Sequence, residues 1–412
     1  MNVHQYIIEN WQKTIRDPSH KGHGIITLPK PFTTPSIEEI FEDFYYWDTY
    51  FINVGLLTDG FFEQAKNNID NIAYLIRNLG YMPNASHLHF TSQPPLFTRA
   101  VFDYWRFSKD DEVLKEYFDA ILQEYTFFSC DRNTKIKLNQ YGCVNFLKCQ
   151  MGWLYNYITN RYKGARRVKQ SREKDIKEYF SIAESGWDAT PRFSTSEATF
   201  APHKYVQVDL NSLIFDMEMI ISQIYSLSGD IENSKKFHEL ALRRKDRMNK
   251  YMRNSDNGIY YDYNFIDKKV SPVVSAVSFY PYVYDITTDK KALEELLKRL
   301  ELEFGLSACE KQNVAGIELQ WDYPIMWAPN AYFAHEALLK NGMAEDAKRI
   351  AEKYMQTIRS VFEKEGILFE KYNAKTGTVA STKDSASHPM LGWTGGIYSY
   401  FYNFYYNDKR FY

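Results

Sequence analysis

The segment "DLNSLIFDMEMIISQIYSLSGDIENSKKFHELALRRKDRM" (residues 209–248) indicates how this chain folds. In its first half the apolar residues recur at the i, i+3, i+4, i+7 spacing of a helix. These residues are Leu210, Leu213, Ile214, Met217, Ile220, Ile221 and Ile224. Gly229 follows them. Helices often end at a residue with left-handed backbone conformation, and glycine is the residue preferred there. A second helical pattern begins at once, so the segment predicts two antiparallel helices joined by a tight turn.

The same arrangement occurs at two further places, "LLTDGFFEQAKNNI" (56–69) and "LLKNGMAEDAKRIAEK" (338–353). Strand patterns are sparse, and "NGIYYDYNF" (257–265) and "EGILFEKYNAKTG" (365–377) indicate local hairpins. The helical repeats are too irregular and too widely spaced for an α-solenoid. We therefore expect an all-α fold, a closed double ring of antiparallel helices with short β-hairpins in the loops. It should form one catalytic domain over residues 1–412, with residues 1–38 as an N-terminal extension packed on it.

Composition excludes several classes of protein. The 50 Lys and Arg residues balance the 52 Asp and Glu residues without a basic stripe, so we expect no nucleic-acid partner. No apolar run reaches the roughly 18–20 residues that span a bilayer, so we expect no membrane partner. The first residues lack the pattern of a secretory signal, and the four cysteines follow neither a zinc nor a disulfide spacing. These features predict a cytoplasmic protein without a metal or other cofactor; the oligomeric state stays open.

Aromatic residues make up 17% of the chain, with 33 Tyr and 8 Trp, and such side chains suit the apolar face and polar rim of a sugar. Acids and aromatics meet in four predicted loop segments: "FYYWDTYF" (44–51), "ESGWDATPRF" (184–193), "ELQWDYPIMWAPN" (318–330) and "LFEKYN" (368–373). Three of them contain Trp-Asp. One such dipeptide is often a helix N-cap, but three at loop–helix junctions favour a shared pocket. A pair of carboxylates in an aromatic pocket is what hydrolysis of a glycosidic bond requires. The residues alone leave open which two acids form the pair.

These segments resemble the trehalases, glycoside hydrolase family 37. "YYWDTYF" (45–51) and "QWDYPIMWAP" (320–329) are similar to the two signature segments of that family. "ESGWDATPRF" resembles the segment around the general acid, "FEKYN" (369–373) the segment with the general base, and "GWTGGIY" (392–398) the closing segment. The matches run in family order from about residue 40 to residue 398. The resemblance implies an (α/α)6 toroid and an inverting α-glucosidase acting on a small carbohydrate such as trehalose.

The resemblance also implies roles for single residues. Asp188 would be the general acid and Glu370 the general base, with carboxyls roughly 6.5–9.5 Å apart. Asp48 would accept hydrogen bonds from sugar hydroxyls, and Trp47 and Trp321 would offer stacking faces. The other positions expected to bind substrate are Phe41, Tyr45, Asn84, Gln93, Arg167, Trp187, Arg192, Gln320, Asp322, Asp384 and Trp393.

The chain departs from the family at some positions that hold the disaccharide. Ile40 and Thr91 stand where arginines are expected, and Asp384 in "TKDSASHP" (382–389) replaces a Gly-rich loop with its Glu. Some resemblance to glycoside hydrolase family 63 keeps a glycosylglycerate or another α-glycoside open as substrate. A sugar isomerase or epimerase, or a sugar-binding protein on the same scaffold, is a further alternative.

Overall fold

The helices of the chain are of two kinds. Some are buried on every side, such as α2 (Tyr46–Asp59), in which all residues except the last are buried. Others bury one face only, such as α13 (Ala344–Glu365), whose buried residues recur every three or four positions. A helix that is apolar all round belongs inside a protein, whereas an amphipathic one covers its surface. The computed structural model describes residues 2–20, 22, 26–38, 40–87, 89–144, 155–156, 160, 171–194, 201–313, 316–382 and 385–408.

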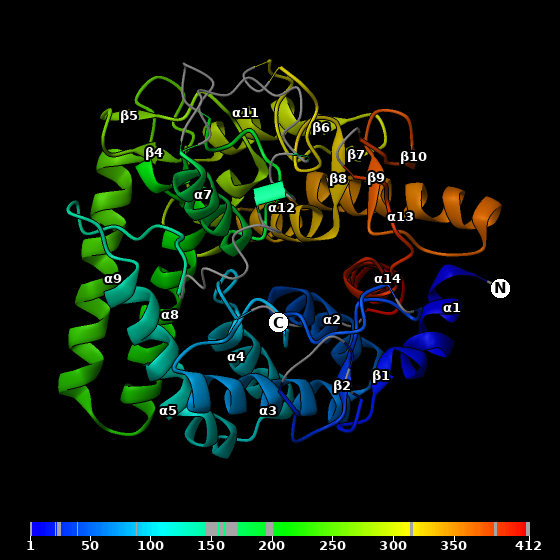
Figure 1. The fold of residues 1–412 in the computed structure, drawn as a ribbon, viewed down its shortest axis with the longest axis horizontal. Coiled ribbons are helices and arrows are strands. Elements are labelled where there is room, and N and C mark those ends of the chain that lie inside the picture. Colours follow the sequence, from blue (N-terminus) through cyan, green and yellow to red (C-terminus); the bar gives the residue numbers. More distant parts are fainter. Residues whose placement is uncertain are drawn as a thin grey trace.

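The largely buried helices form a closed inner ring. In order around it they are α2, α4 (Phe97–Ser108), α8 (Val208–Leu227), α10 (Tyr280–Val283), α12 (Ala328–Lys340) and α14 (Gly392–Tyr406). Each helix contacts the next, and the last, α14, packs closely against the first, α2. Figure 1 shows α14 nearly end-on beside α2. The ring therefore closes between segments at opposite ends of the sequence.

The amphipathic helices lie outside this ring. They are α1 (Val3–Asn10), α3 (Phe62–Leu79), α5 (Glu112–Thr126), α9 (Ile231–Tyr251), α11 (Lys290–Leu300) and α13. α3 packs on α2, α5 on α4, α9 on α8, α13 on α12 and α1 on α14, while α11 contacts the short helix η5 (Ala276–Phe279) that leads into α10. The two layers confirm the predicted (α/α)6 toroid.

The three predicted turns between paired helices are confirmed. Gly60, Gly229 and Gly342 all have positive φ, at 91°, 82° and 73°. Each lies where a helix of the inner ring ends and its outer partner begins. Residues with a side chain rarely adopt this backbone conformation, which is why glycine marks these turns in the sequence.

Short strands lie in the loops. β8 (Ile325–Trp327), β9 (Lys371–Asn373) and β10 (Thr378–Val379) form an antiparallel sheet with β9 in the middle, and Trp327 lies opposite Lys371 in it. A second sheet pairs β3 (Tyr205–Val206), β4 (Tyr263–Asn264) and β5 (Lys269–Val270). Two more pairs are β1 (Ile15–Arg16) with β2 (Phe32–Thr33), and β6 (Glu301–Leu302) with β7 (Gly305–Leu306). The β8–β9 pairing brings two of the acid–aromatic segments together.

The remaining helical segments are short or lie over the ring. They are α7 (Arg172–Glu184), η1 (Trp11–Thr14), η2 (Phe127–Asp131) and η4 (Pro202–Lys204). α7 ends directly before the segment that contains Asp188. In the described part of the chain, no helix is long and apolar enough to cross a membrane.

Candidate active site

Five tryptophans from four separate segments form one cluster at the start of the inner helices. The rings of Trp321 and Trp327 stack with centroids 4.0 Å apart and an angle of 3° between their planes. The ring of Trp187 lies 4.8 Å from that of Trp321 and the ring of Trp47 lies 5.5 Å from it. Trp393 meets Trp327 and Trp47 edge-on. All five are buried, so they form a rigid apolar floor whose faces pack largely against one another.

Three carboxyl groups from three different segments meet at this floor. Asp48 lies in the first turn of α2, is buried, and has a pKa raised to about 7. Burial is the largest cause, and the negative charges of Glu370 and Asp188 add to it. Glu370 is itself buried, with 7% of its surface exposed, and Asp188 is half-buried. The fold therefore gathers the two acids predicted as catalytic around a third acid predicted to bind substrate.

The backbone around Asp188 is fixed by close packing. Gly186 has a φ of 70°, and a Cβ at this position would lie 2.8 Å from the ring of Trp47. Only glycine fits such a position without a shift of the ring. Ala189 also has a positive φ, and its carbonyl accepts a hydrogen bond from the backbone N–H of Trp321 at 3.2 Å. Asp188 thus projects from a turn clamped between two members of the cluster.

The sequence around this site matches a known protein family. The family model described as "Trehalase" matches residues 2–406. The chain belongs to the trehalase family. It is 28% identical over 401 residues to periplasmic trehalases of Escherichia coli and of Shigella flexneri, covering 92% of this chain and 69% of each relative.

Solved structures share the fold of this trehalase family member. Neutral trehalase from Saccharomyces cerevisiae has a TM-score of 0.75 at 22% identity, over 98% of this chain and 80% of that one. A family 63 mannosylglycerate hydrolase from Thermus thermophilus, in complex with glucose, has a TM-score of 0.66 at 14% identity, over 97% and 99% of the two chains. These structures confirm the fold, and the family match over residues 2–406 confirms the resemblance drawn from the sequence and shows that the chain is a glycosidase.

The comparison corrects one expectation. The sequence features predicted a cytoplasmic protein, but the similar curated proteins are named periplasmic trehalases. The cytoplasmic prediction is therefore wrong. It relied on first residues without the pattern of a secretory signal and on cysteines without a disulfide pattern; Cys130, Cys143 and Cys309 are indeed free thiols. Unpaired cysteines do not show whether a protein is cytoplasmic or periplasmic, because a protein that needs no disulfide can be stable in both compartments.

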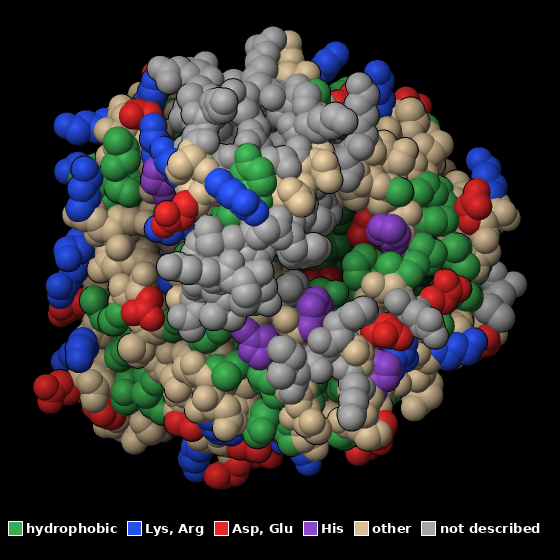
Figure 2. All heavy atoms as spheres, in the orientation of Figure 1, with side chains coloured by type: hydrophobic (Ala, Val, Ile, Leu, Met, Phe, Trp, Pro, Cys, Tyr) green, Lys and Arg blue, Asp and Glu red, His purple; other side chains and the backbone are tan. Residues whose placement is uncertain are grey.

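The predicted sugar-binding residues at the rim lie in ring contact with histidines. Phe41 and Tyr45 are half-buried, and their rings lie 6.1 Å apart, edge to face. His388 packs against Phe41 and His87 against Tyr45, at 5.8 and 5.9 Å. Figure 2 shows this face hollowed to the right of its centre, with acidic and histidine side chains at the opening.

Two residues predicted to bind substrate, Gln93 and Asn84, instead form hydrogen bonds to the backbone near the tryptophan cluster. The side-chain carbonyl of Gln93 accepts a hydrogen bond from the backbone N–H of Trp47 at 3.1 Å. The Asn84 amide donates to the carbonyl of Ala183 at 3.3 Å, at the end of α7. Both side chains are buried, so their contacts fix the first turn of α2 and the helix that leads to Asp188.

Gln320 and Asp322 flank Trp321, and both side chains accept hydrogen bonds from nearby protein groups. Gln320 accepts a hydrogen bond from Lys371 at 3.3 Å. Asp322 accepts two from the Gln312 amide at 3.0 and 2.9 Å and one from the Tyr323 N–H at 2.7 Å. Burial raises the pKa of Asp322 to about 7, against these hydrogen bonds, which favour the charged form. Asp322 therefore orders the loop around Trp321.

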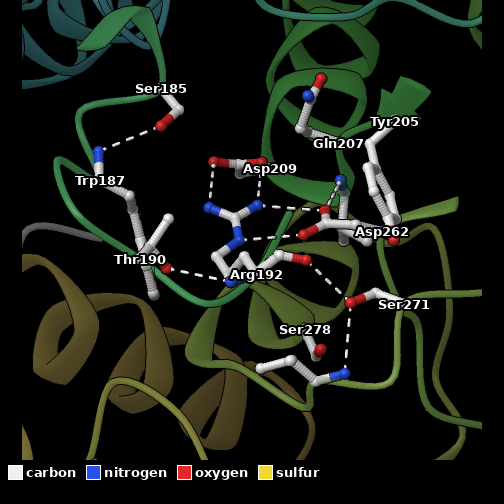
Figure 3. Close-up of polar contacts among 12 residues, drawn as sticks. Ser185, Trp187, Thr190, Arg192, Tyr205, Gln207, Asp209, Asp262, Ser271 and Ser278 are labelled. Atoms are coloured by element: carbon white, nitrogen blue, oxygen red, sulfur yellow. Dashed lines mark hydrogen bonds and ion pairs between the residues drawn. The ribbon is translucent and has the colours of Figure 1, made fainter. Parts of the chain in front are cut away.

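Arg192 lies behind the cluster rather than at the opening. Its side chain has no exposed surface and forms ion pairs with Asp209 at 2.8 Å and with Asp262 at 3.0 Å. Its guanidinium also lies over the Trp187 ring, 4.6 Å from the centroid. Figure 3 shows the guanidinium between the two carboxylates, beside Trp187. The sequence indicated a substrate contact, but these bonds commit the donors to two acids, so Arg192 supports Trp187 instead.

One buried ion pair next to the candidate site was not identified from the sequence. Arg132 forms a bidentate ion pair with Glu184, with both N–O distances at 2.7 Å, and both side chains are buried. Glu184 also accepts hydrogen bonds from the N–H groups of Ser92 and Gly142. This pair ties the end of α7 to the segment of Gln93. Its one sequence signal was the position of Glu184 at the head of "ESGWD".

Two predicted residues, Arg167 and Asp384, lie outside the described residues. Among the described ones, no group of three or more His, Cys, Asp or Glu side chains could hold a metal ion.

Proposed function

We propose that this chain hydrolyses trehalose, an α-glucoside, with inversion at the anomeric carbon. Asp188 is the general acid, which protonates the glycosidic oxygen of the leaving sugar. Glu370 is the general base, which takes a proton from the water that attacks C1 from the opposite face. The substrate assignment rests on the names of the similar trehalases and on the family match over residues 2–406.

The observation that carries the carboxylate mechanism is the convergence of acids on Asp48. The charges of Asp188 and Glu370 both raise the pKa of this buried carboxyl, so both acids lie close to it. They come from segments far apart in the sequence. With a pKa of about 7, Asp48 can either accept a hydrogen bond from a sugar hydroxyl or donate one.

Substitution of the two acids tests the assignment. Asp188→Asn and Glu370→Gln should each lower kcat on trehalose by at least about 10³-fold, because each removes a proton-transfer group from the transition state. Asp256→Asn and Glu363→Gln, at exposed positions, are matched controls that should keep full activity. Residual activity within tenfold of wild type in either site variant would contradict the role of that acid.

The anomers released test inversion. An inverting enzyme converts one α-linked glucose into the β-anomer and releases the other as the α-anomer, so early NMR spectra should show equal amounts. A retaining enzyme would release the α-anomer alone at first. That second result would contradict the inverting mechanism.

The rim gives a reason to test a second substrate class. Ile40, at a position where the family has an arginine, is 41% exposed, and Thr91 is buried. Each replaced guanidinium would otherwise provide charged hydrogen bonds to sugar hydroxyls, worth roughly 1.5–3 kcal/mol each. A parallel assay on α-glucosylglycerate and other α-glucosides should show trehalose as the best substrate by kcat/KM. If kcat/KM for another glycoside exceeded that for trehalose tenfold, the proposed substrate would change to that class of glycoside.

A further inference from the structure

Lys371 is a fully buried cation beside the proposed general base. Its side chain has no exposed surface. Its ammonium group lies 2.9 Å from Oε1 of Glu370, 2.7 Å from Oγ of Ser385 and 3.3 Å from Oε1 of Gln320. The contacts with Ser385 and Gln320 are hydrogen bonds that the ammonium donates, and the contact with Glu370 is an ion pair. The Nζ atom also lies 5.3 Å from the centroid of the Trp327 ring.

The β-sheet explains how Lys371 reaches this place. Lys371 begins β9, directly opposite Trp327 of β8, so its side chain extends along the tryptophan floor. A buried ammonium is costly unless it is paired and hydrogen-bonded, and its carboxylate partner here is the residue before it in sequence. The chain thus places an ammonium group inside the site, 2.9 Å from Oε1 of Glu370.

The site needs such a charge because it gathers acids. Glu370 lies close enough to Asp48 to perturb its ionisation, and Asp188 does the same. Carboxyl groups that share a buried site compete for protons, and some of them become protonated. A protonated Glu370 could not accept a proton from water. The ammonium group of Lys371 places a compensating positive charge 2.9 Å from Oε1 of Glu370, inside this group of acids.

Lys371 also completes the fixation of Glu370. The Glu370 N–H donates to the carbonyl of His388 at 3.0 Å, and the Glu370 carbonyl accepts from the Trp393 indole at 3.1 Å. Lys371 holds Oε1.

We propose that Lys371 is a positioning residue for hydrolysis: its ammonium group offsets the negative charge of Glu370 and holds this carboxylate in place for the attacking water. The inference rests on the proposed role of Glu370 as general base. In the step itself, the water oxygen bonds to C1 while the glycosidic C–O bond breaks. One water proton passes to the carboxylate of Glu370, and the leaving oxygen takes the proton of Asp188. Lys371 remains protonated throughout and exchanges nothing.

The test is the pH profile of kcat/KM for three substitutions. Lys371→Met removes charge and hydrogen bonds, Lys371→Gln keeps hydrogen bonding without the charge, and Lys371→Arg keeps the charge. The acidic limb should move to higher pH by about 1 unit in the Met and Gln variants and stay in place in the Arg variant. The plateau of kcat should fall by up to about 10²-fold in all three, because the base is less well aimed. An acidic limb that coincides with wild type in Lys371→Gln would overturn the proposal.

A matched control is available in Lys353, which pairs with Glu301 at 2.7 Å away from the site. Lys353→Met should leave the pH profile unchanged. If Lys371→Met does not fold, the comparison of the Gln and Arg variants still separates the effect of charge from that of structure. Melting temperatures of all variants identify any loss of fold.

A double substitution separates this inference from the assignment of Glu370. If Lys371 acts through Glu370, then Lys371→Gln should cost less than about threefold in kcat when added to Glu370→Gln. If Lys371→Gln instead lowered kcat by the same factor in the Glu370→Gln protein as in the wild type, Lys371 would act independently of Glu370. That result would overturn the inference. High activity in Glu370→Gln alone would instead contradict the proposed base. An inactive Glu370→Gln with an unmoved acidic limb in Lys371→Gln would contradict only the role of Lys371.

Discussion

At the scale of single residues, Asp48 is a buried carboxyl that the fold holds partly neutral. Burial and the charges of Glu370 and Asp188 raise its pKa to about 7, whereas an aspartate in an unfolded chain titrates near 3.9. Between about pH 4 and pH 7 the folded protein therefore binds more protons here than the unfolded chain does. Asp48 therefore makes its largest contribution to the free energy of unfolding below about pH 4. That contribution is lost as the pH rises through 7.

Asp48→Asn should consequently stabilise the protein at high pH while it damages the site. The amide stays neutral, so the free energy of unfolding should rise by roughly 1–3 kcal/mol at pH 8 and change little at pH 4.5. Calorimetry at both pH values measures the difference. Asp256→Asn, at an exposed position, should show no such pH dependence. An equal effect of Asp48→Asn at the two pH values would contradict the raised pKa.

The sequence predicts that these acids and tryptophans share one site, but it does not predict the groups that hold them in place. Trp47, Trp187 and Trp321 stand next to acids in short motifs, so their pattern is local and readable. The ion pair of Arg132 and Glu184 joins residues 52 positions apart, and no local pattern predicts such a pair. Likewise, nothing near Lys371 in the sequence shows that it is buried rather than exposed. That depends on β8, which lies more than forty residues earlier.

Breaking the Arg132–Glu184 pair should weaken both stability and catalysis. Arg132→Met leaves Glu184 as an uncompensated buried charge, which typically costs about 3–5 kcal/mol, and it loosens the segment before Asp188. We expect a lower melting temperature and a lower kcat. Arg243→Met breaks an exposed ion pair with Glu239 on α9 and should cost less than about 0.5 kcal/mol. Similar melting temperatures for the two variants would contradict a structural role for the buried pair.

At the scale of elements, the crossing of α2 and α14 depends on glycine. Gly55 of α2 and Gly396 of α14 face each other, and a Cβ on Gly396 would overlap the carbonyl oxygen of Phe51. Glycine is a poor helix former, and "GWTGGIY" (392–398) is therefore an unfavourable helix by composition. The close approach of the two backbones explains why these residues are present. The turns at Gly60, Gly229 and Gly342 could be predicted from the sequence because their cause is local, whereas this crossing could not.

Gly396→Ala should therefore destabilise the protein although alanine favours a helix. Propensity alone predicts a gain of about 1 kcal/mol, but the overlap with the backbone should reverse its sign and cost about 3 kcal/mol. Chemical denaturation measures the free energy. Gly395→Ala is the matched control, because its Cβ would meet the movable side chains of Leu391 and Ile7 at 3.2 and 3.4 Å. A stabilised Gly396→Ala protein would contradict backbone contact as the determinant of this crossing.

At the scale of the whole molecule, ring closure joins residues from both ends of the chain. Asp59, the last residue of α2, accepts hydrogen bonds from Trp11 at 2.8 Å and from Asn403 at 2.8 Å, and lies 2.9 Å from His4. These partners belong to η1, α14 and α1. The sequence indicated that the helices form a ring, but the residue that closes it was not predictable, because Asn403 lies 344 positions from Asp59. That residues 1–412 form one catalytic domain, with residues 1–38 as an extension, stays a prediction.

Asp59→Ala tests whether this buried carboxylate holds the N-terminal segment on the ring. The substitution leaves up to three buried donors without an acceptor, each at a cost of about 1–3 kcal/mol, so we expect a loss of about 2–4 kcal/mol after relaxation. Asp59→Asn keeps one side-chain oxygen and should cost less. Limited proteolysis should cut the Ala variant first within residues 2–20, since α1 contacts the ring mainly through α14. Activity of the surviving fold at low temperature should stay near wild type, because Asp59 lies at the end of α2 remote from Asp48. Wild-type stability and unchanged cleavage sites in Asp59→Ala would show that packing of α1 and Trp11, rather than their hydrogen bonds, closes the ring.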